Sequence, residues 1–67
     1  MSQPTDRSRD NGYLIEFRRI GASVKVSAVD PRTGTEISMV GPASVSQTEL
    51  SRNAINKLEY VLAQKLR

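Results

Sequence analysis

The chain has 67 residues with no cysteine and no histidine, which excludes disulfide bridges, thiolate sites and imidazole metal sites. Its formal net charge of +3 permits weak attraction to anionic partners without requiring it. No apolar stretch resembles a signal peptide or a membrane span. We therefore expect a cytoplasmic protein with no metal, no cofactor and no membrane partner.

Residues 1–12 have the composition of a disordered tail. Polar and charged residues dominate this stretch, and no large apolar residue follows Met1. Residues 13–67 then form a single domain, close to the lower size limit for a chain that buries its core alone. Association with another chain is the remaining way to complete so small a core.

Two runs rich in β-forming residues, 13–20 and 23–29, predict a hairpin. Gly21 can supply the positive φ at the first central position of a type II′ turn. The register that this turn imposes sets Phe17 opposite Val26, so the apolar residues of both strands lie on one face.

The turn at 30–34 and the run at 35–40 predict a third strand. The turn begins with Asp and Pro, and Gly34 can take the left-handed conformation after them. Gly41 and Pro42 end the strand. The expected sheet is a three-stranded antiparallel meander in the order 1-2-3.

A capping box marks the start of a C-terminal helix. Ser46 can accept a hydrogen bond from the N–H of Glu49, with Val45 and Leu50 as a hydrophobic staple. The helix should run from about Gln47 to Leu66. Its apolar stripe consists of Leu50, Ala54, Ile55, Leu58, Val61, Leu62 and Leu66. The predicted fold class is α+β, with the order β-β-β-α and the helix on one face of the sheet.

Apolar residues on the outer side of this sheet favour self-association. Leu14 and Val29 would lie directly opposite each other there, with Ile20 and Val40 elsewhere on the same side. We expect these four residues to carry a homodimer. Tyr60, on the polar side of the helix, is a weaker candidate for the same interface.

Three modes of self-association remain open at this stage. A second copy could cover the outer sheet face, extend the sheet at an edge strand, or exchange its helix through the connection at 41–45. An adaptor role toward another protein is also compatible with such a surface.

Nucleic-acid binding is the alternative function. Arg18, Lys25 and Arg32, with Arg19 near the turn, would be the residues that contact it. Two glutamates interrupt this basic surface, which makes it less suited to phosphate contacts. The aromatic residues of the strands point to the core side and offer no stacking platform.

We expect no enzymatic activity. Without His or Cys, the many hydroxyl groups have few general bases beside them. Glu16 and Glu36 fit a solvated face of mixed charge better than a paired-carboxylate site. The glycines mark turns and have no phosphate-loop spacing.

Several segments together resemble a known family. They are Glu-Phe-Arg-Arg-Ile-Gly at 16–21, Val-Lys-Val at 24–26, Ala-Val-Asp-Pro at 28–31 and Thr-Gly-Thr-Glu at 33–36. With them the chain resembles a short family of uncharacterised, mainly alphaproteobacterial proteins of unknown function, over roughly residues 13–65. The resemblance implies small cytoplasmic proteins and no catalytic or ligand-binding residue.

Overall fold

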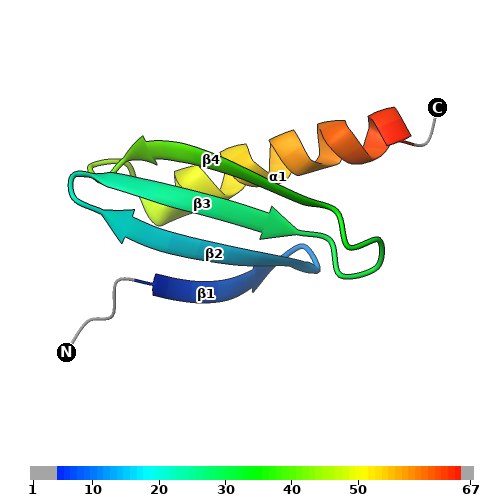
Figure 1. Cartoon of the computed structure of the whole chain (residues 1–67), viewed down its shortest axis with the longest axis horizontal. Helices are drawn as coiled ribbons and strands as arrows, with labels where there is room; N and C mark the ends of the chain where they lie inside the picture. The colour runs from blue at the N-terminus through cyan, green and yellow to red at the C-terminus, as the bar shows by residue number, and fades with distance from the viewer. Residues whose placement is uncertain (1–4, 66–67) are drawn as a thin grey trace.

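The computed structural model of the protein describes residues 5–65. Its elements in chain order are β1 (Thr5–Asp10), β2 (Tyr13–Ile20), β3 (Ser23–Val29), β4 (Glu36–Pro42) and α1 (Gln47–Lys65). The strands form one antiparallel sheet in the order β1-β2-β3-β4, and α1 crosses one face of it (Figure 1). The expected α+β fold with one C-terminal helix is confirmed. Leu66 lies outside the described residues.

The sheet has four strands, so the expected three-stranded meander is wrong on this point. β1 occupies residues of the expected disordered tail and pairs with β2 along its whole length. Asn11 (φ 54°) and Gly12 (φ 83°) connect the two strands, and positive φ at both positions is what a type I′ hairpin turn requires. β1 has no apolar side chain, which is why its composition indicates disorder. Its backbone groups nevertheless pair with β2 in an antiparallel ladder.

The other turns and registers agree with the predictions. Gly21 has a φ of 62° and Gly34 a φ of 75°, and Phe17 lies opposite Val26. β4 continues to Pro42, beyond its expected end. β4 is an edge strand, where the missing N–H of proline is tolerated.

The helix begins where the capping box places it. Ser46 Oγ accepts a hydrogen bond from the N–H of Glu49 at 3.2 Å, and α1 starts at Gln47. α1 packs against β2, β3 and β4, and its last turns extend beyond the sheet (Figure 1). Within residues 5–65, no helix is both long and apolar enough to cross a membrane.

A single apolar core fills the space between the sheet and the helix. Its partly buried margin includes Val61 and Leu62 of the predicted stripe. The buried core residues are Tyr13, Ile15, Phe17, Val26, Ala28, Ile37, Leu50, Ala54, Ile55 and Leu58. The opposite face of the sheet is left uncovered by the described chain, and that face is the candidate functional surface.

Candidate interaction surface

The face of the sheet that points away from α1 is called here the outer face. Side chains alternate between the two faces of a strand, and the observed registers place opposed residues of neighbouring strands on the same face. The outer face therefore carries Arg7, Arg9, Leu14, Glu16, Arg18, Ile20, Ser23, Lys25, Ser27, Val29, Glu36, Ser38, Val40 and Pro42.

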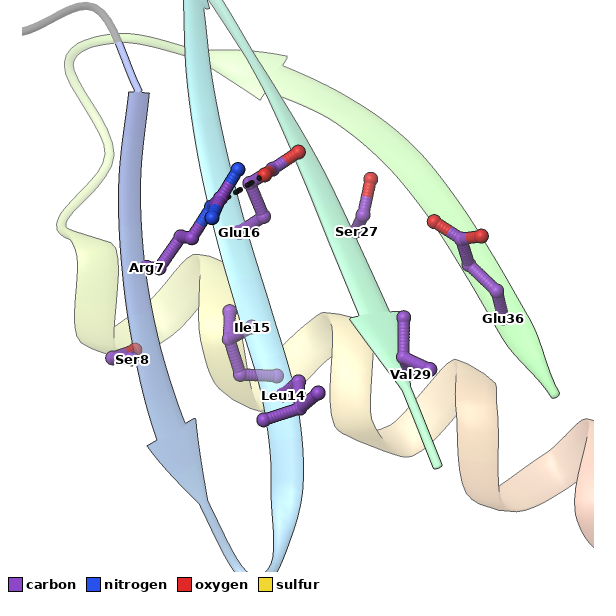
Figure 2. Close-up of a pocket in the computed structure, with 8 residues that line it drawn as sticks. All are labelled: Arg7, Ser8, Leu14, Ile15, Glu16, Ser27, Val29 and Glu36. Carbon is purple, nitrogen blue, oxygen red and sulfur yellow. Dashed lines mark hydrogen bonds and ion pairs between the residues drawn. The ribbon is translucent and has the colours of Figure 1, made fainter. Parts of the chain in front are cut away.

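An apolar pair lies at one end of the outer face. Leu14 of β2 is directly opposite Val29 of β3, as the sequence predicts, and Leu14 remains 38% exposed. The two residues help to line a hollow of about 260 Å³. Figure 2 shows them at the lower end of the hollow, with Arg7 and Glu16 on one side and Glu36 on the other. The hollow thus combines an apolar part with charged flanks.

The remaining candidate interface residues lie elsewhere. Ile20 and Val40 are exposed at the far end of the outer face, near the Gly21 turn, and are separated from Leu14 by rows of polar residues. Tyr60 is 66% exposed on α1. The structure therefore does not bring the five predicted residues into one patch.

Two of the four predicted nucleic-acid contacts are neighbours. Arg18 and Lys25 are directly opposed on β2 and β3, and no carboxylate forms an ion pair with either of them within residues 5–65. Arg19 is engaged elsewhere, because its Nε donates to the carbonyl of Gly21 at 2.9 Å. Arg32 belongs to the β3–β4 turn, where it contacts Asp30.

β1 adds two arginines to the outer face that the sequence analysis missed. Arg7 lies opposite Glu16, and its Nε donates to Glu16 Oε2 at 3.1 Å (Figure 2). Arg9 lies opposite Leu14 at the edge of the sheet. The signal that could have found them is the Asn11-Gly12 pair, because this dipeptide is typical of a two-residue hairpin turn.

The acidic residues of β1 face the helix side instead. Gln47 Nε2 donates to Asp6 Oδ2 at 3.2 Å, and Ser51 Oγ donates to Asp10 Oδ2 at 3.1 Å. Carboxylates are favoured there because the first turn of a helix carries a partial positive charge. β1 therefore places its positive charges on the outer face and its negative charges beside the start of α1.

A polar network closes the β3–β4 turn. Asp30 is 2% exposed, and its carboxylate accepts hydrogen bonds from the backbone N–H of Arg32 at 3.0 Å and from the hydroxyl of Thr33 at 3.2 Å. The bond from the Arg32 N–H, together with the Thr33 hydroxyl and the Arg32 charge, lowers the pKa of Asp30 below 3.8 although burial opposes this. These contacts have a structural role: they hold the turn.

No metal-ion site is evident among the residues that the structure describes. Within residues 5–65, no three acidic side chains are close enough to hold an ion. Every buried side-chain polar atom of these residues has a hydrogen-bond partner.

The comparison with known families agrees with the resemblance read from the sequence. The family described as "Domain of unknown function (DUF6898)" matches residues 10–65. The chain belongs to this family. The DUF6898 match begins at the last residue of β1 and covers the Asn11-Gly12 turn, β2, β3, β4 and α1. No curated protein and no solved structure matches the chain.

Proposed function

We propose that this protein acts by association, as a homodimer in which the outer faces of two sheets pack against each other. The observation that carries this proposal is the apolar pair of exposed Leu14 and half-buried Val29, which helps to line the hollow of the outer face. Burying such a pair against its copy removes apolar surface from water, which is the main driving force for association.

Packing of the outer faces is favoured over pairing at the β4 edge. Lys57 Nζ donates to the carbonyl of Ser38 on β4 at 3.2 Å. A lysine at an edge strand opposes the addition of another strand.

Face packing is also favoured over exchange of the helix. The N–H of Ala43 donates to the carbonyl of Ala22 at 2.8 Å, and the N–H of Val45 donates to the carbonyl of Pro42 at 3.1 Å. Extending this connection for helix exchange would break both bonds and separate α1 from its core.

The size of the face implies a weak dimer. Strand spacings of about 4.8 Å and rises of about 3.4 Å per residue give the four-stranded face a flat area of roughly 450 Å². Stable interfaces bury about 800 Å² on each partner. We expect dissociation constants of about 10–100 μM, where affinity depends on a few central contacts.

Analytical ultracentrifugation over about 5–500 μM, a range that brackets such an affinity, tests the proposal. The wild type should shift from the 7.4 kDa chain mass toward twice that mass. Leu14→Lys should remain monomeric, because each lysine would place a charge in the apolar centre of the interface. Val40→Lys, at the far end of the face, is the matched control and should still dimerise. A wild type that stays monomeric over the whole range contradicts the proposal.

Nucleic-acid binding is the second candidate, and one observation favours it. Arg18 and Lys25 are opposed at close range, an arrangement that destabilises a sheet unless an anion offsets it. Arg7 and Arg9 extend the positive charge toward β1. A gel shift with duplex DNA at about 50 mM salt that disappears at about 200 mM, and in Arg18→Ala/Lys25→Ala, would support this function. No shift at low salt contradicts it.

A further inference from the structure

One row of side chains crosses the whole outer face with an ordered change of character. Arg9 of β1 is opposite Leu14 of β2, Leu14 is opposite Val29 of β3, and Val29 is opposite Glu36 of β4. The row therefore reads basic, apolar, apolar, acidic from one edge of the sheet to the other. Arg9 and Glu36 are both exposed, and neither forms an ion pair within the described residues.

A second copy of this row that runs in the opposite direction is complementary to the first, since its acidic end then faces the basic end. A two-fold axis in the contact plane, parallel to the strands and midway between β2 and β3, reverses the order of the strands in the second copy. Arg9 then faces the partner's Glu36, and Leu14 faces the partner's Val29. Because a two-fold interface is isologous, each of these contacts occurs twice.

We propose that the homodimer is built on this row, with two Arg9–Glu36 ion pairs enclosing four apolar side chains at its centre. This inference rests on the proposed function and specifies its geometry. The other symmetric arrangement of stacked faces has its axis along the row. It would place Arg9 against the partner's Arg9 and Glu36 against the partner's Glu36, which is repulsive at both edges.

The basic pair at the far end of the face is compatible with this dimer. Arg18 and Lys25 lie four residues along the strands from the row, a distance of about 14 Å. Packed sheets cross at about 30°, which tilts the two-fold axis by about 15° from the strands and makes corresponding rows diverge away from the contact centre. Screening over a Debye length of about 8 Å at physiological salt weakens the remaining repulsion between these side chains.

Charge reversal tests the row directly by ultracentrifugation. Arg9→Glu should weaken self-association by at least about tenfold, because both ion pairs become repulsive. Glu36→Arg should do the same from the opposite edge. An equimolar mixture of the two variants should form a heterodimer with an affinity within about threefold of the wild type, since every facing pair is again of opposite charge.

The controls separate the two proposals. The double variant Arg9→Glu/Glu36→Arg should dimerise like the wild type, and Arg18→Glu should lose no affinity. Circular dichroism verifies that each variant is folded. A monomeric wild type overturns the proposed function itself. A dimeric wild type with unaffected single variants, or a mixture that fails to restore association, overturns the row geometry alone.

Discussion

The phenolic oxygen of Tyr13 on β2 donates a hydrogen bond to Glu59 Oε2 on α1 at 3.1 Å. Tyr13 is buried at the start of its strand, and Glu59 lies on the exposed side of the helix. This bond joins the sheet to the helix at the margin of the core, between a buried and an exposed residue. Burial, and then the bond to the Glu59 carboxylate, raise the pKa of Tyr13 above its ordinary value of 10.0.

The raised pKa of Tyr13 predicts a loss of stability at alkaline pH. The folded protein holds the phenol proton more tightly than the unfolded chain, so this stabilisation is complete below pH 10.0. It is lost as the pH rises through the higher pKa of the folded state. Tyr13→Phe should flatten the stability profile above about pH 10, measured by urea denaturation. Tyr60→Phe, which removes an exposed phenol, is the matched control; an equal effect of both variants contradicts the prediction.

Asp30 predicts the opposite dependence at acid pH. Its pKa is lowered in the folded state, so its contribution is present above 3.8 and is lost as the pH falls from 3.8 through the folded value. Asp30→Asn should destabilise the protein at neutral pH and reduce the slope of stability against pH below about 4. Thr33→Val removes one of the hydrogen bonds to the carboxylate and should give an intermediate slope. An unchanged slope in Asp30→Asn would be the contrary result.

Gly41 leaves room for Leu50, the first core residue of α1. A Cβ at position 41 would lie 2.7 Å from Leu50 Cδ2, so Gly41→Ala should cost about 1–3 kcal/mol through overpacking. Leu50→Ala should cost about 2–5 kcal/mol as a cavity variant. In the double variant the Gly41→Ala substitution should cost less, because the methyl group that it meets is gone. Chemical denaturation of the four proteins checks this, and strictly additive costs contradict it.

β1 should be the least stable strand. Its residues from Asp6 to Asp10 are all exposed, and it adds none of the buried core residues. Hydrogen exchange should therefore be faster in β1 than in β3, which lies between two strands. Gly12→Ala should add about 1–2 kcal/mol of strain at a left-handed position and increase exchange in β1 while β3 and β4 stay protected. Uniform protection across the sheet would be inconsistent with this account.

The strand registers were predictable because local turn chemistry and apolar alternation agree. Gly21 sets the first predicted turn, and the resulting pairing of Phe17 with Val26 is observed. β1 was not predictable from hydrophobic alternation, because its pairing uses backbone groups that every residue carries. The Asn11-Gly12 signal was the one local clue to this strand.

The candidate surface was predictable only in part. The Leu14–Val29 contact follows from the hairpin register, and the structure places it as expected. Ile20 and Val40 are exposed elsewhere on the same face, as expected, and polar rows separate them from that pair. The position of Arg9 on the outer face could not be predicted without β1, because a residue in a disordered tail belongs to no face of the sheet.

The sequence by itself determined the central strands, the two turns between them and the start of the helix, since each depends on contacts between residues close in the chain. Only the tertiary structure decided that residues 5–10 form a strand and that their charges separate, with arginines on the outer face and aspartates beside α1. The physical reason is that the face on which a strand residue lies depends on its pairing with a neighbouring strand. The charges of these residues sum to zero, and their composition carries no information about that pairing.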